Sequence, residues 1–122
     1  FSSNLNQKIS AMWININKRG VRNALHFHAN SFLSGVFYLQ IKAKLEEGSL
    51  SFRNPNSMMM MSQWISPGLI ENFNPENVRG WQVCLSAGDL ILFPSWLEHE
   101  VFPHNENEDR ISISFNTTLV EN

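Results

Sequence analysis

Apolar and polar residues alternate at every second position through most of this chain, and this pattern limits what it can fold into. The alternating segments are rich in β-branched and aromatic residues and are bounded by Gly, Pro and Asn, whereas no long segment has the spacing of an amphipathic helix. The pattern predicts eight strands, at residues 11–17, 24–28, 34–43, 49–53, 82–86, 89–93, 99–102 and 110–117. Eight short strands are typical of an all-β sandwich or of a double-stranded β-helix, the jelly-roll barrel.

Length and composition favour a single domain over residues 1–122. The chain has 122 residues, of which 43% are hydrophobic, and this is enough for one substantial core but not for two. The sequence does not begin with methionine, so elements upstream of Phe1 could belong to the same reading frame. The stretch from Pro55 to Arg79 is long for a connection in a compact domain, and we expect it to be a lid or an insertion.

Charge and cysteine content exclude several classes of partner. The net charge is −2 and no run of Lys or Arg exceeds two residues, so we expect no binding to nucleic acid. No apolar stretch has the length of a membrane span. The single cysteine, Cys84, lies in the alternating segment from Trp81 to Leu85, which predicts a buried thiol and a reducing, cytoplasmic location.

Three histidines form a candidate metal site. His26 and His28 are two residues apart on a predicted strand, so their side chains should point to the same face. His99 begins a later strand directly after a turn and is the natural third ligand. Imidazole suits iron, zinc, copper or nickel, so the ligand type does not select the metal. The fourth histidine, His104, lies in a polar loop and is expected to be exposed to solvent.

The last predicted strand carries a second candidate site. Arg110, Ser112, Ser114 and Asn116 share one face, and the other face is apolar. An arginine with a nearby hydroxyl group can bind a carboxylate with two hydrogen bonds, and the only tyrosine, Tyr38, could reach the same carboxylate. Alternatively, this strand is an exposed edge whose polar face meets solvent, and Tyr38 is a packing residue.

Nearly the whole chain resembles the 2-oxoglutarate- and Fe(II)-dependent oxygenases, of the prolyl-hydroxylase-like type common in marine bacteria and phages. The resemblance rests on Trp13–Asn17, Gly20, Asn23, His26–His28, Ser34–Leu39, Gly48–Pro55, Gly88–His99 and Arg110–Asn116. It implies a double-stranded β-helix that binds Fe(II) and 2-oxoglutarate and hydroxylates a small-molecule or peptide substrate. It also implies that His99 is the distal iron ligand, that Arg110 binds the C5 carboxylate of 2-oxoglutarate, that Tyr38 hydrogen-bonds it, and that Ser112 lines the pocket.

The chain departs from the wider superfamily at one ligand. Members of that superfamily use His-x-Asp or His-x-Glu as the proximal pair, and this chain has neither. If His26 is the superfamily histidine, His28 takes the place of the acid; if His28 is that histidine, Asn30 takes it. We prefer the first register, because imidazole is a much better ligand than a neutral amide and the strand should still be regular at His28.

Two other classes of function are open at this stage. A cupin, which shares the barrel, would also use His26, His28 and His99, but it would need a glutamate shortly after His28 and would not need Arg110. The other alternative is a non-catalytic β-domain with a vestigial metal site; the run Met58–Met61 could cover the surface of a partner. The sequence also leaves open whether the chain forms a homodimer.

Overall fold

The computed structural model describes residues 4–42, 44, 47–57 and 70–121 and places eight strands in them. Every one of the eight predicted strands has a counterpart. The strands are β1 Leu5–Asn17, β2 Asn23–His26, β3 Leu33–Gln40, β4 Leu50–Arg53, β5 Gly80–Val83, β6 Leu90–Pro94, β7 His99–Val101 and β8 Arg110–Glu121.

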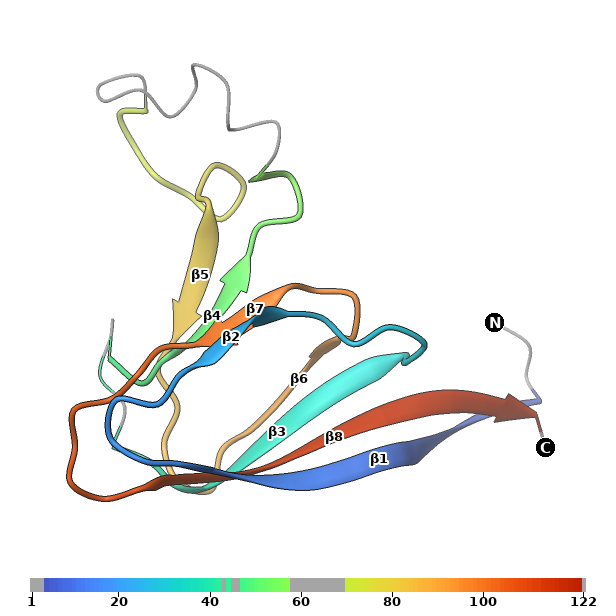
Figure 1. Cartoon of the computed structure of the whole chain (residues 1–122). Helices are drawn as coiled ribbons and strands as arrows, with labels where there is room; N and C mark the ends of the chain where they lie inside the picture. Colours follow the sequence, from blue (N-terminus) through green and yellow to red (C-terminus); the bar gives the residue numbers. More distant parts are fainter. Residues whose placement is uncertain (1–3, 43, 45–46, 58–69, 122) are drawn as a thin grey trace.

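The strands form two four-stranded sheets that face each other (Figure 1), in the orders β1-β8-β3-β6 and β2-β7-β4-β5. Apart from the hairpin β4-β5, each strand is followed by one in the opposite sheet, so the chain winds back and forth between the two layers. Every pairing between strands is antiparallel. This winding is that of a double-stranded β-helix, which confirms the predicted fold.

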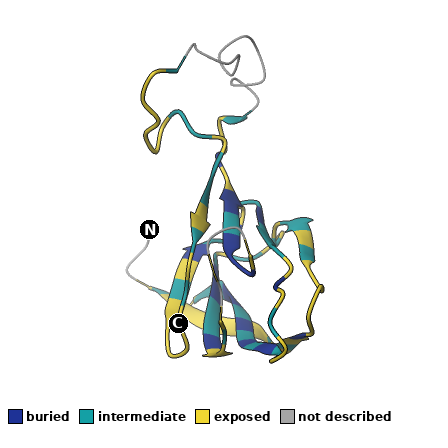
Figure 2. Cartoon of the chain, turned by 90° about the vertical axis from the view of Figure 1, so that its left-hand side faces the viewer, coloured by how far each residue is buried: buried dark blue, intermediate teal, exposed yellow. Residues whose placement is uncertain are grey.

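Strand β8 lies inside the larger sheet, paired with β1 on one side and β3 on the other. Its polar residues Arg110, Ser112, Ser114 and Asn116 are all buried, and the intervening Ile111, Ile113 and Phe115 are only half-buried. The alternation of buried and exposed positions along the strands is visible in Figure 2. The exposed-edge interpretation of this strand is therefore wrong, because its polar face points into the interior.

The apolar core occupies another part of the interior. Leu50 and Phe52 of β4 and Phe93 of β6 are buried together, and the Phe52 and Phe93 rings pack edge to face with their centroids 5.0 Å apart. Half-buried hydrophobic residues surround them: Val36, Trp81, Val83, Leu85, Ile91, Leu97 and Val101. The space between the sheets is thus divided into an apolar part and a polar part.

Several strand boundaries differ from the prediction. β1 and β8 pair from Leu5↔Glu121 to Asn17↔Arg110, so both strands are longer than predicted. The extra residues of β1 are mostly polar and mostly exposed, and backbone pairing does not require apolar and polar residues to alternate there. β5 starts two residues early, and β3 ends at Gln40. The predicted end of β3 at residue 43 and the four methionines 58–61 lie outside the described residues, as does most of the predicted lid or insertion.

The environments predicted for Cys84 and His104 are wrong. Cys84 is exposed, because β5 is an edge strand that ends one residue before it. His104 is buried: its Nε2 hydrogen-bonds to the Asn17 carbonyl oxygen at 2.8 Å, and its own carbonyl oxygen accepts a bond from Gly20 N at 2.9 Å. The polar loop around His104 therefore packs onto the β1-β2 connection and is not solvated at this position.

The outer face of the larger sheet is apolar. Rows of side chains cross it: Met12, Phe115, Gly35 and Leu92 in one row, Ile14, Ile113, Phe37 and Leu90 in the next, and Ile16 beside Ile111 in a third. The members on the outer strands β1 and β6 are each more than half exposed. None of the described residues forms a helix long and apolar enough to cross a membrane.

Candidate metal and cosubstrate site

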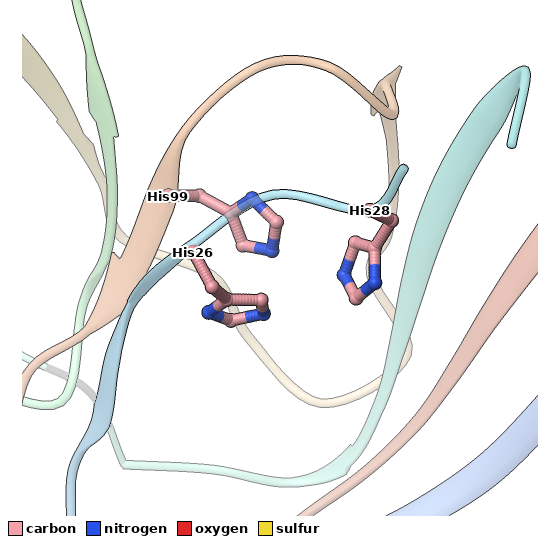
Figure 3. A group of neighbouring side chains, drawn as sticks. All are labelled: His26, His28 and His99. Carbon is pink, nitrogen blue, oxygen red and sulfur yellow. The ribbon is translucent and has the colours of Figure 1, made fainter. Parts of the chain in front are cut away.

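The structure brings together the three histidines that the sequence singled out (Figure 3). His26 ends β2, His99 begins β7, and the two residues are directly paired across these strands. The ring centroids lie 4.3 Å apart for His26 and His99, 5.0 Å for His26 and His28, and 5.2 Å for His28 and His99. One ring nitrogen from each side chain lies within 4.8 Å of the others. This spacing suits three imidazoles that share one metal ion.

His28 reaches this cluster from outside a strand. β2 ends at His26, so the expectation of a regular strand at His28 is wrong. The chain leaves the smaller sheet here to begin β3 in the larger one, and Asn30 takes a left-handed backbone conformation with φ 61° in the connecting turn. His28 is held by a hydrogen bond from its backbone N–H to the Ser95 carbonyl oxygen at 2.9 Å and by the Trp13 ring, whose centroid is 5.7 Å away.

Backbone carbonyl groups orient two of the imidazoles. His26 Nδ1 lies 2.6 Å from the Ala24 carbonyl oxygen, and His99 Nδ1 lies 2.9 Å from that of Leu97. A carbonyl oxygen only accepts, so in each neutral ring Nδ1 carries the hydrogen and Nε2 keeps its lone pair. Such outer hydrogen bonds fix the tautomer and the orientation of metal-binding histidines. Both Nε2 atoms are therefore available as ligands.

Burial keeps His99 neutral. The residue is packed against the Phe93 ring, with the centroids 4.7 Å apart. Burial lowers the pKa of His99 from 6.5 to about 4, although the hydrogen bond to Leu97 opposes this shift. Burial also lowers the pKa of His28, and nearby His26 adds to that effect. Neutral imidazole is the form that binds a metal, so both side chains are in the binding form at neutral pH.

Arg110 lies in the same cavity without a counter-ion. The residue is buried, and its Nη1 donates hydrogen bonds to the carbonyl oxygens of Gly48 at 3.0 Å and Phe102 at 3.2 Å. Within the described part of the chain it makes no salt bridge with a carboxylate. A guanidinium group stays charged at any physiological pH, and a buried charge without an opposite charge is costly. The site therefore favours an anionic ligand.

Tyr38 and Ser112 accompany Arg110. They are paired across β3 and β8, and both are buried. Burial raises the pKa of Tyr38, and the charge of Arg110 opposes this shift, so the hydroxyl group is protonated at neutral pH and can donate a hydrogen bond. One cavity is lined by residues of both sheets. It contains the residues of both candidate sites: His26, His28, His99, Tyr38, Arg110 and Ser112.

Other residues of this cavity were given no role in the site from the sequence alone. Trp13, Asn15 and Asn17 line it from β1, and Asn23 lines it from β2. The alternation in β1 could have indicated that the first three line one cavity, because residues 13, 15 and 17 share a face of the strand. Asn30, the alternative ligand, is exposed.

Comparison with known proteins identifies the family. A profile for a family described as "Putative 2OG-Fe(II) oxygenase" matches residues 11–116. This chain belongs to that 2OG-Fe(II) oxygenase family. The family name specifies iron(II) and 2-oxoglutarate, which are the metal and cosubstrate implied by the sequence resemblance. No curated protein sequence matches the chain.

Solved oxygenase structures share the fold. A 2OG-Fe(II) oxygenase family oxidoreductase from Burkholderia pseudomallei superposes with a TM-score of 0.67 at 16% identity, over 97% of this chain and 48% of its own. For a Pseudomonas putida prolyl-4-hydroxylase, the TM-score is 0.58 at 20% identity, over 86% and 50%. For HygX from Streptomyces hygroscopicus, solved with nickel and 2-oxoglutarate, it is 0.64 at 13%, over 92% and 57%. This chain spans about half the length of these oxygenases.

Substitution of single histidines should show which residues bind the metal. We expect His26→Ala, His28→Ala and His99→Ala each to weaken Co²⁺ binding by more than the roughly 10- to 100-fold that loss of an outer-shell partner costs, because each removes a ligand. Calorimetric titration of the metal-free protein measures this. Asn30→Gly, which removes the amide without straining the left-handed conformation, should bind Co²⁺ like the wild type. Loss of binding in Asn30→Gly but not in His26→Ala would favour the other register.

Acid should destabilise the metal-free protein through His99. The unfolded chain takes up a proton at this residue near pH 6.5, whereas the folded chain does so only near pH 4, so stability is complete above pH 6.5 and is lost as the pH falls towards 4. This predicts a loss of about 2 kcal/mol in the free energy of unfolding between pH 7 and pH 5. Urea unfolding at both pH values tests it, and His99→Gln should lose less. An equal loss in wild type and His99→Gln would contradict a buried, neutral His99.

Proposed function

We propose that this chain is an Fe(II)- and 2-oxoglutarate-dependent dioxygenase that hydroxylates a small-molecule or peptide substrate. The observation that supports this most is that three converging imidazoles line one cavity with a buried arginine that has no counter-ion among the described residues. The first group suits a divalent metal ion, and the second suits the far carboxylate of a dicarboxylic acid. 2-Oxoglutarate has the shape and charge to contact both.

His26, His28 and His99 would hold the iron. Three neutral ligands leave both positive charges of Fe(II) uncompensated, and a dianionic cosubstrate would offset them. This can replace the role of the carboxylate ligand that the chain lacks. When bound, the iron would supply the oxidative chemistry that uses dioxygen as the oxidant: one oxygen atom would enter succinate as 2-oxoglutarate loses carbon dioxide, and the other would enter the hydroxyl group formed at a substrate C–H bond.

Arg110, Tyr38 and Ser112 would bind and orient 2-oxoglutarate. Arg110 donates from Nη1 to two carbonyl oxygens, which fixes the plane of the guanidinium group. No other hydrogen bond of this group involves the described residues, so its other N–H groups can bind a carboxylate. Tyr38 would donate its hydroxyl hydrogen to the same carboxylate, and Ser112 lies directly across from Tyr38. Two fixed ends, at the metal and at Arg110, would hold the cosubstrate in one orientation.

The competing classes of function fit these observations less well. A cupin would use the three histidines, but it would have no need for a buried guanidinium group. A non-catalytic domain with a vestigial site would have no reason to retain both a metal-binding cluster and an anion-binding residue in one cavity.

The exposed Cys84 has a free thiol, which suits the reducing conditions of the cytoplasm, the location that we propose.

Arg110→Ala should abolish most 2-oxoglutarate binding and leave metal binding intact, because the guanidinium group binds the cosubstrate and is not a metal ligand. We expect a loss of about 2 to 5 kcal/mol, or roughly thirtyfold to several-thousandfold in affinity. Arg110→Lys should recover part of it, since lysine supplies the charge without the paired hydrogen bonds. Anaerobic calorimetry of the Fe(II)-loaded proteins measures these affinities.

Arg53→Ala is the matched control, because Arg53 is exposed and pairs with Glu98 at 3.4 Å. It should bind 2-oxoglutarate like the wild type. Equal affinities for wild type, Arg110→Ala and Arg53→Ala would remove the cosubstrate assignment.

We further propose that a second copy of the chain covers the apolar outer face of the larger sheet. No charged side chain lies in the three rows on this face, so two copies would meet without repulsion there. Four strands about 4.8 Å apart and three rows about 7 Å apart make a face of roughly 400 Å². A standard interface buries about 800 Å² per partner, so the dimer should be weak.

Ile14→Glu should abolish this dimer, because Ile14 lies in the middle row and is 63% exposed. Sedimentation equilibrium over a range of concentrations should show a monomer and a dimer for the wild type and only a monomer for Ile14→Glu. Val21→Glu adds the same charge at an exposed position outside β1 and should still dimerise. A wild type that stays monomeric throughout would contradict the proposal.

A further inference from the structure

The turn between β6 and β7 contacts two of the three histidines. The Ser95 carbonyl oxygen accepts a hydrogen bond from the backbone N–H of His28 at 2.9 Å, and the Leu97 carbonyl oxygen lies 2.9 Å from His99 Nδ1. A bond from Leu97 N to the Pro94 carbonyl oxygen at 3.0 Å closes the turn. A displacement of this turn would therefore move both side chains relative to His26.

Ser95 also holds the segment that carries His28. Its carbonyl oxygen binds His28, and its backbone N–H donates to the Phe32 carbonyl oxygen at 3.2 Å, just before β3 begins. These two bonds attach both ends of the connection between β2 and β3 to one residue. The β2-β7 pairing ends at His26↔His99, so it does not extend to His28. The position of His28 thus depends on where Ser95 lies.

The side chain of Ser95 is fixed from inside the barrel. Ser95 is fully buried, and its Oγ lies 2.9 Å from Ser34 Oγ. Ser34 Oγ donates its one hydrogen to Asn116 Oδ1 at 2.8 Å, so in the bond between the two serines Ser95 must be the donor. A directed chain of hydrogen bonds therefore runs from the turn through β3 to β8, and all three members are buried. A buried hydroxyl group with satisfied partners resists displacement, because displacement would leave a buried partner without its hydrogen bond.

We propose that Ser95 is a positioning residue for the metal site, which it serves by holding His28 at coordination distance from His26 and His99. This inference rests on the proposed function, since it takes His28 to be a ligand. A histidine on a strand is oriented by the ladder of its sheet, whereas His28 lies beyond the end of β2. The hydrogen-bonded chain of Ser95, Ser34 and Asn116 fixes the position of His28, which the hydrogen bonds between strands do not reach.

Co²⁺ affinity of the metal-free protein tests this by calorimetry. Ser95→Ala and Ser34→Ala each interrupt the chain, and each should weaken Co²⁺ binding about tenfold, at the lower end of the loss typical of outer-shell partners. Ser34→Ala also serves if Ser95→Ala does not fold. Ser49→Ala is the matched control: Ser49 is an equally buried serine whose Oγ has no hydrogen-bond partner among the described residues. It should bind Co²⁺ like the wild type.

A double-mutant cycle separates positioning of His28 from general weakening of the fold. If Ser95 acts mainly through His28, Ser95→Ala should have a much smaller effect on Co²⁺ affinity in a His28→Ala protein than in a His26→Ala protein. An equal effect in both backgrounds would overturn the proposal while leaving the metal site in place. If His28→Ala alone leaves Co²⁺ affinity unchanged, the three-histidine site itself is wrong, and the positioning role fails with it.

Discussion

The burial of a polar strand face in the centre of the larger sheet is the constraint on which the rest of this structure depends. β8 turns Arg110, Ser112, Ser114 and Asn116 into the interior and leaves isoleucines on the outer face. Each buried polar group needs a partner, or it costs about 1–3 kcal/mol. Asn15 and Ser34 supply such partners to Ser114 and Asn116. In the part of the chain that the structure describes, the hydrogen-bond partners of Arg110 are carbonyl oxygens, so its charge is left for a ligand.

The same arrangement explains why the metal site and the anion site lie together. The smaller sheet contributes His26 and His99 from paired strands, and the larger sheet contributes Arg110 and Tyr38. Both sets project into the space between the sheets, next to a compact apolar core around Phe93. Contact with that core keeps His99 neutral. Arg110 makes no salt bridge with a carboxylate in the described part of the chain. The space between the sheets therefore holds the candidate metal site, made of neutral imidazoles, next to the candidate anion site at the positively charged Arg110.

Much of this could be predicted from the sequence, because strand alternation is a local property. It predicted the eight strands, the residues of β8 that share a face, and His26 as a candidate metal ligand, but it left open whether the polar face of β8 points inward. It could not locate His28 correctly, since the end of β2 depends on where the chain crosses between sheets. It also placed His104 in solvent, because a polar loop does not reveal a packing partner as distant in sequence as Asn17. The exposure of Cys84 depends on β5 being an edge strand, which only the sheet order shows.

The central claim is that iron and 2-oxoglutarate bind together in this cavity. The most direct test is an anaerobic titration of the Fe(II)-loaded chain with 2-oxoglutarate, followed by visible absorption. Chelation of the iron by the cosubstrate should produce a metal-to-ligand charge-transfer band that saturates at one equivalent per chain. Saturating Fe(II) binding with no such band at any 2-oxoglutarate concentration would contradict the account and favour a metal site of another kind.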